Sequence, residues 1–258
     1  MLTNRDSQCR ALADLGKVIA SAFAFEMKQA YMDVVMKDRD AWNFHERAAK
    51  GADMIADWLA DGAGEDKEET AAADFARAFL GAGVVNQVAA YPFESVYTSP
   101  TRLVMQDAYE AVRQLYHKYG FVKSEDCDLH EDHIALEIQF LAHLSGRAAK
   151  LFEEGKEAEA CDVLRLQKTF IETHIENWVS RFCDDVRACP VSPFYKGWSY
   201  ILEGFVFTLK GAIEDMLQEC PSLTTKRSRA DRWWRVPSVP RRCLPWGRAC
   251  AARRDQAS

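Results

Sequence analysis

The sequence predicts an all-α protein, a globular bundle of irregular helices. Three observations support this class. Apolar residues recur at helical spacing along most of the first 220 residues, and no stretch alternates polar and apolar residues among strand-forming types. The first 220 residues also contain only four prolines, all at expected helix borders. With 258 residues, 48% of them hydrophobic, the chain can bury a sizeable core.

The first expected helix runs from Ala11 to Val35, where apolar residues lie three or four apart. A second helix is expected from Trp42 to Leu59, followed by the polar break "DGAGEDKEE". A short third helix is expected from Thr70 to Leu80, and two glycines close it.

The next helix has a clear start signal in the sequence. Ser99 can cap a helix with its hydroxyl, and Pro100 suits the first helical position, where its missing N–H costs nothing. We expect this helix to run to about Tyr119 and to stop at Gly120.

Three longer helices are expected in the second half. The first covers Asp132 to Glu154 and ends at Gly155. Another covers Lys156 to about Arg187, and the last runs from Phe194 to Cys220, where Pro221 stops it.

Composition divides the chain into a helical domain, residues 1–220, and a basic tail rich in Pro and Trp, residues 221–258. The last 35 residues hold ten Lys or Arg and two acids, which leaves 23 basic and 37 acidic residues, a net charge of −14, in 1–223. A body this acidic repels nucleic acid and anionic lipid and attracts cationic partners, although solubility alone would also explain it. The tail is expected to be poorly ordered or to form a separate binding segment.

Nothing in the sequence indicates export or membrane insertion. The N-terminus is polar and of mixed charge, and no window has the roughly 18 apolar residues that a span requires. The eight cysteines show no CxxC pair, so we expect reduced thiols in a cytoplasmic protein.

The stretch "YPFESVYTSP", residues 91–100, interrupts this helical chain with three rings and an acid, which are Tyr91, Phe93, Tyr97 and Glu94. For any single one of these rings, the best explanation is that it packs in the hydrophobic core at a junction between helices. Three rings and a carboxylate in one expected loop favour recognition, because binding residues concentrate on loops held by rigid helices.

A second segment, "DLHEDHIALEIQFLAHL", residues 128–144, crowds charge at the start of a helix, with His130, Glu131, Asp132 and His133. Asp132 there satisfies free backbone donors and suits the helix dipole, which needs no function. The alternative is a metal site of His130 and His133 with Asp128 or Glu137, but the pattern is not HExxH.

A third segment, "FIETHIENWVSRF", residues 170–182, places His174 on an apolar helical stripe, where it is expected to be a buried, hydrogen-bonded structural residue. No nucleophile elbow, P-loop or dinucleotide fingerprint occurs, and no cofactor is indicated. The sequence therefore predicts a protein that is not an enzyme.

The three segments together, followed by "FYKGWSYIL", resemble the TorD/DmsD/NarJ family of redox-enzyme maturation chaperones, nearest its TorD/DmsD branch. The resemblance covers roughly residues 10–218 and leaves the tail outside. The order and spacing of the segments in an acidic, all-helical chain carry it. One departure is His130, where the family commonly has a proline.

The resemblance implies a cytoplasmic chaperone for a molybdenum enzyme of the dimethyl sulfoxide reductase type, which binds that enzyme's twin-arginine signal peptide and delays export until the cofactor is inserted. The partners would be this peptide and the apo form of the catalytic subunit. Members of the family can be monomers or helix-exchanged dimers. The peptide-binding motifs of the family fall on Tyr91, Pro92, Phe93, Ser95, Val96, Tyr97, Asp132 and His133.

A twin-arginine peptide offers two guanidinium groups beside an apolar run, so its receptor needs carboxylates next to exposed apolar surface. Glu94, Glu131 and Asp132 are the candidate carboxylates. The rings of residues 91–97 would supply the apolar wall, facing the start of the 132–154 helix. The two other hypotheses are a metal-dependent helical hydrolase that uses His130 and His133, and a generic helical adaptor without preference for arginine pairs.

Overall fold

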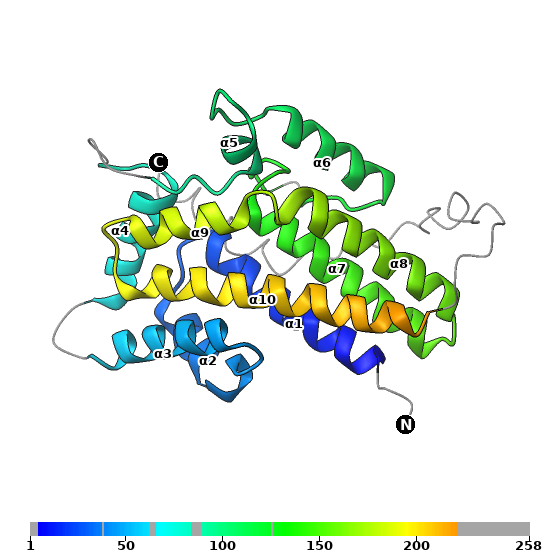
Figure 1. The fold of residues 1–258 in the computed structure, drawn as a ribbon. Coiled ribbons are helices and arrows are strands. Elements are labelled where there is room, and N and C mark those ends of the chain that lie inside the picture. Colours follow the sequence, from blue (N-terminus) through cyan, green and yellow to red (C-terminus); the bar gives the residue numbers. More distant parts are fainter. Residues whose placement is uncertain (1–4, 38, 62–65, 84–88, 125, 221–258) are drawn as a thin grey trace.

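The computed structural model describes residues 5–37, 39–61, 66–83, 89–124 and 126–220. Over these residues the chain forms ten α-helices and two short turns of other helical pitch, without a strand, so the predicted all-α class is confirmed (Figure 1). None of the described helices is long and apolar enough to cross a membrane. The predicted tail of 221–258 lies outside the described residues.

The helices are α1 Arg5–Ala24, α2 Gln29–Met36, α3 Glu46–Ala60, α4 Lys67–Phe79, α5 Glu94–Thr98, α6 Asp107–Lys118, α7 Ile134–Glu153, α8 Glu157–Phe170, α9 Val179–Ala188 and α10 Pro193–Gln218. A 3₁₀ turn, η1, covers Arg39–Trp42, and a π-helical turn, η2, covers Ile171–Ile175.

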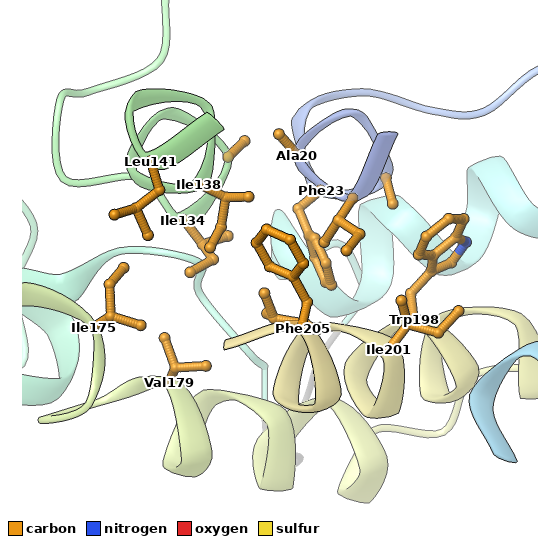
Figure 2. Close-up of a cluster of buried hydrophobic side chains, with 14 of the residues drawn as sticks. Ala20, Phe23, Ile134, Ile138, Leu141, Ile175, Val179, Trp198, Ile201 and Phe205 are labelled. Carbon is orange, nitrogen blue, oxygen red and sulfur yellow. The ribbon is translucent and has the colours of Figure 1, made fainter. Parts of the chain in front are cut away.

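The core lies around α1, which packs along α7 and also contacts α10, with α8 beside α7 and α3 beside α10 (Figure 1). Figure 2 shows Phe205 of α10 facing Ile138 of α7 and Phe23 of α1. All three side chains are buried. Most of α7 is buried on every side, which identifies it as the central helix of the bundle.

Helix α3 crosses α10 at very short range because each contributes a glycine. A Cβ atom on Gly51 would lie 2.3 Å from the carbonyl oxygen of Gly197, and one on Gly197 would lie 2.6 Å from the carbonyl oxygen of Gly51. The two backbones are therefore in direct contact, and no side chain fits between them.

The single helix predicted for Ala11 to Val35 is wrong, because α1 ends at Ala24 and α2 begins at Gln29. A distant acid explains the break. The carboxylate of Glu68 on α4 accepts the backbone N–H of Gln29 at 3.0 Å and binds the ammonium of Lys28 at 2.7 Å. This contact satisfies a donor at the start of a new helix, and local apolar spacing does not reveal it.

The helix start predicted at Ser99 and Pro100 is also wrong. Ser99 follows the last residue of α5, and α6 begins only at Asp107. The backbone N–H of Gln106 donates to Oγ of Ser95 at 3.1 Å, which closes residues 99–106 into a loop. Part of the stretch expected to be non-helical, residues 94–98, is itself the short helix α5.

The long helix predicted from Lys156 to Arg187 is interrupted. It consists of α8, the π-helical turn η2 and α9. The indole N–H of Trp178 donates to the carbonyl oxygen of His174 at 2.7 Å, and Trp178 leaves helical geometry with φ of −144°. The other four predicted helices are confirmed to within about four residues at each end, as α3, α4, α7 and α10.

The expectation that all cysteines are reduced is wrong for one pair, because Cys161 and Cys220 form a disulfide. The bond joins the first turns of α8 to the end of α10, 59 residues later in the chain. The fold brings the two Cα atoms to 6.1 Å, which is within disulfide range. Sequence spacing does not reveal a pair this distant.

We expect thiol titration of the denatured protein to find two more thiols after reduction than before it. Cys161→Ser should abolish this difference, and Cys9→Ser, at a buried cysteine outside the bond, should leave it at two. Equal thiol counts with and without reductant would contradict the disulfide.

Candidate aromatic-loop site

The two segments singled out in the sequence lie against each other. Phe93 and His133 form an antiparallel bridge. The backbone N–H of Glu94 donates to the carbonyl oxygen of Asp132, and that of Ile134 donates to the carbonyl oxygen of Pro92, both at 2.9 Å. The structure thus places the loop beside the start of α7. We call residues 91–98 the aromatic loop, although 94–98 are helical.

Asp132 joins the aromatic loop to α7 by capping α5. Its Oδ2 accepts the backbone N–H of Ser95, in the first turn of α5, at 3.0 Å. The side chain is fully buried, and this burial raises the pKa of the carboxyl group, opposed by the hydrogen bonds from Ser95. The sequence suggested that Asp132 caps the helix that follows it, and the structure shows that it caps a different one.

His133 is the residue that caps α7. Its Nδ1 accepts the backbone N–H of Ala135 at 3.1 Å, so Nδ1 carries no proton. The ring is buried, and its edge meets the ring of Phe93 with 5.0 Å between the centroids. Burial, assisted by the nearby His130, lowers the pKa of His133 to about 3. The ring is therefore neutral at physiological pH.

Glu94 is buried as well, and its carboxylate binds two side chains from beyond α8. Nδ1 of His174 lies 3.0 Å from Oε2, and the amide of Asn177 donates to Oε1 at 2.9 Å. His174 is hydrogen-bonded, as predicted, but its side chain is half-buried rather than buried. The carboxylates of Glu94 and Asp132 do not face solvent, so a direct ion pair with a guanidinium group would require the loop to open. Their peptide-binding role stays a prediction.

The three rings of the aromatic loop have different environments. Tyr97 is buried, its hydroxyl 3.1 Å from Oδ2 of Asp185, and its ring packs on Trp178. Phe93 is half-buried, whereas Tyr91 is 41% exposed. The phenol of Tyr91 lies against Gly81, where an added Cβ would approach the hydroxyl to 2.5 Å. Pro92 and Val96 are buried.

Exposed apolar side chains are concentrated in the part of the sequence that contains the aromatic loop. Five of the seven large apolar side chains exposed among the described residues fall between positions 80 and 105 of the chain, and they are Leu80, Tyr91, Leu103, Val104 and Met105. We call these five residues the apolar patch. The sequence analysis missed residues 103–105 because it assigned them to a helix.

The backbone holds part of the apolar patch in a defined shape. Arg102 and Met105 both adopt left-handed conformations, with φ of 53° and 58°. Such values are uncommon for residues other than glycine, and the surrounding contacts must hold them in place. The bond between Gln106 and Ser95 is one such contact.

An acidic segment lies next to the aromatic loop, just before α7. Asp126 and Asp128 are exposed, and the side chain of Glu131 keeps 17% of its surface, with Lys123 at 3.4 Å from its carboxylate. The ring of His130 packs on Phe93, with 5.8 Å between the centroids, so this segment adjoins the half-buried ring of the loop.

The geometry does not favour the metal-dependent alternative. His130 packs between the rings of Phe93 and Tyr109, and Nδ1 of His133 already accepts a backbone N–H. Glu137 lies fully buried inside α7. Within the described part of the chain, no three His, Cys, Asp or Glu side chains are arranged so that they could hold a metal ion.

A cavity of about 470 Å³ lies elsewhere, between α3, α9 and α10. Its charged residues bind mainly one another. Glu203 accepts hydrogen bonds from Arg47 at 2.9 Å and from Arg187 at 3.0 Å, and Arg187 also reaches Asp184 at 2.6 Å. The sequence analysis did not anticipate this cavity, and none of the predicted site residues lines it.

Comparison with known proteins points to one family. The family model described as "Nitrate reductase delta subunit" matches residues 44–184, slightly more than half of the chain, including the aromatic loop and the start of α7. Curated relatives named "Chaperone protein TorD" are also similar.

The protein of Vibrio cholerae serotype O1 (El Tor Inaba N16961) is 26% identical over 155 residues, which is 60% of this chain and 67% of the relative. That of Aliivibrio salmonicida is 28% identical over 142 residues, 55% of this chain and 63% of the relative. That of Photobacterium profundum is 28% identical over 55% of this chain and 62% of the relative.

The matches therefore span about two thirds of the length of these relatives. Their names describe chaperones, which supports the prediction that the chain is not an enzyme. The resemblance indicated by the three segments is confirmed. This chain belongs to the nitrate reductase delta subunit family, the TorD/NarJ family of redox-enzyme maturation chaperones.

Proposed function

We propose that this chain is a cytoplasmic maturation chaperone that binds the twin-arginine signal peptide of a molybdenum oxidoreductase of the dimethyl sulfoxide reductase type, and that it delays export of the apo form until the cofactor is inserted. Similarity to proteins named TorD chaperones supports the class. The observation that carries the specific role is the exposure of the apolar patch, on and near the aromatic loop in sequence, together with the acidic segment that contacts this loop through His130 and Phe93.

The two surfaces match the two halves of a twin-arginine peptide. Guanidinium groups pair with carboxylates in a planar, two-point geometry, and Asp126, Asp128 and Glu131 offer such carboxylates at or near the surface. The apolar run of the peptide would lie on the apolar patch and shield it from water. Binding of this kind requires no catalytic group.

The predicted site residues divide into two roles under this proposal. Tyr91, Phe93 and Glu131 reach the surface and would touch the peptide. The buried members shape the loop from below, and they are Pro92, Glu94, Ser95, Val96, Tyr97, Asp132 and His133.

The test is calorimetric titration with a synthetic twin-arginine leader peptide. Leu103→Ser combined with Val104→Ser should lower the affinity at least tenfold, because two apolar contacts worth about 1 kcal/mol or more are lost. Leu103 and Val104 do not have the left-handed backbone conformation of Arg102 and Met105, so serine at these two positions adds no backbone strain. Phe207→Ser is the matched control, since Phe207 is 70% exposed on α10 outside the patch, and it should leave the affinity unchanged.

A second peptide with Arg–Arg replaced by Lys–Lys tests the acidic half of the proposal. Lysine cannot form the two-point contact, so this peptide should bind more weakly. Equal affinity for the two peptides would favour a generic adaptor instead. Equal loss in the patch variant and in the Phe207→Ser control would remove the apolar patch from the site.

A further inference from the structure

Glu94 is the point where three separate segments meet. It opens α5, is 2% exposed, and donates its backbone N–H to the carbonyl oxygen of Asp132 at 2.9 Å. Its two carboxylate oxygens are bound separately, one by His174 and the other by Asn177. The residue thus links the aromatic loop to the start of α7 through its backbone and to the chain after α8 through its side chain.

The irregular turn between α8 and α9 supplies both partners of Glu94. The π-helical turn η2 contains His174, and Asn177 lies two residues after its last residue, Ile175. The amide of Asn177 also donates to the carbonyl oxygen of Thr173 at 2.9 Å, which fixes its orientation. π-helical turns inside α-helices frequently mark functional sites, because the extra residue redirects side chains.

A second acid lies below this link. Glu137 on α7 is fully buried, and its pKa is held well above the ordinary range by burial first and then by the charges of Glu94 and Asp132. The hydroxyl of Tyr116 on α6 faces the same acids and has a raised pKa, again mainly through burial. Burial therefore favours the protonated, neutral form of Glu137. Burying three acids together is costly, and natural proteins break packing rules of this kind mainly at functional sites.

We propose that Glu94 is a positioning residue for the peptide site, which holds α5 against η2 and so keeps both flanks of α5 in the binding conformation. Upstream lies Tyr91, and downstream lies the 99–106 loop, which Ser95 of α5 ties back through Gln106. This inference rests on the proposed function. A five-residue helix is not stable by itself, so its position depends on these side-chain contacts.

The test compares glutamine substitutions at the two acids. Glu94→Gln replaces one of the two carboxylate oxygens that bind His174 and Asn177 by an amide NH₂ group and should lower the affinity for the leader peptide about tenfold. Glu137→Gln replaces a neutral acid by a neutral amide of the same shape and should bind as the wild type does. Glu137→Ala should bind the leader peptide less well than the wild type. Glutamine is therefore expected to preserve the peptide affinity at position 137 but not at position 94.

Glu176→Gln is the matched control, because Glu176 immediately precedes Asn177 in sequence but its carboxylate binds Lys210 at 2.7 Å. Its affinity should equal that of the wild type. Circular dichroism should show the same helix content for every variant. Equal peptide affinity of Glu94→Gln and the wild type would overturn the positioning role, and so would a tenfold loss in Glu137→Gln.

A measurement without peptide separates this inference from the proposed function. Amide hydrogen exchange of residues 95–106 should be faster in Glu94→Gln than in the wild type and unchanged in Glu176→Gln. If the wild type fails to bind the leader but this exchange pattern is found, the proposed function fails and the link through Glu94 stands. Unchanged exchange in Glu94→Gln overturns the inference.

Discussion

Replacing Gly197 by alanine is expected to destabilise the protein by about 3 kcal/mol or more. The added Cβ would lie 2.6 Å from the carbonyl oxygen of Gly51 and 2.6 Å from Cγ1 of Ile55. One of these neighbours is backbone, so only a separation of α3 from α10 relieves the overlap. Gly51→Ala should act in the same way, since its Cβ would meet the carbonyl oxygen of Gly197 at 2.3 Å.

Equilibrium unfolding in urea checks this expectation, with Gly211→Ala as the control on the same helix. A Cβ at Gly211 meets nothing within 4 Å, so alanine there should raise the free energy of unfolding by about 0.5–1 kcal/mol through its better helix propensity. Opposite signs at positions 197 and 211 are therefore expected. A Gly197→Ala variant as stable as the wild type would contradict the close crossing.

The second large effect is on stability at acid pH, through His133. Its pKa is about 3 in the folded protein, below its ordinary value of 6.5, so the unfolded chain takes up a proton between these values and the folded chain does not. The contribution of neutral His133 to the free energy of unfolding is therefore fully present above pH 6.5 and is lost as the pH falls toward 3. The loss is about 1.4 kcal/mol per pH unit, or about 2 kcal/mol at pH 5.

His133→Asn isolates this contribution, because asparagine is a good helix cap and does not titrate. The wild type should lose about 2 kcal/mol relative to this variant between pH 7 and pH 5, measured by urea unfolding at each pH. Asp132 and Glu137 have raised pKa values and act with the opposite sign, losing stability as the pH rises, so the comparison with the variant is needed. Parallel pH profiles would contradict a buried neutral His133.

The sequence predicts the helical class because that class depends on local patterns, whereas the pairing of the two motifs was expected from the resemblance to a known family. Apolar spacing identified the cores of α3, α4, α7 and α10, and the family motif placed the aromatic loop beside Asp132 and His133. The breaks in the longer predicted helices depend on distant partners. Glu68 caps α2 from 39 residues away, and local propensity contains no information about it.

The site was predicted less completely, and for a similar reason. Residue type identified Glu94 and Asp132 as acids near rings, but their burial follows from partners 83 and 37 residues away, Asn177 and Ser95. The exposure of Leu103 and Val104 depends on the loop that Ser95 closes. Residue types in the sequence therefore identified the candidate acids and rings of the site. Which of these side chains face solvent is decided by tertiary contacts, which the sequence pattern does not show.

The adjacent caps at Asp132 and His133 have a consequence for synthesis on the ribosome. Asp132 caps α5 and His133 caps α7, and the carboxylate of Glu94 binds His174 and Asn177, which follow it by about 80 residues in the chain. A nascent chain that has emerged only as far as α6 lacks Asp132, His133, His174 and Asn177. The contacts that hold its aromatic loop in place are therefore absent. These contacts can form only after about two thirds of the chain, up to Asn177, has left the exit tunnel.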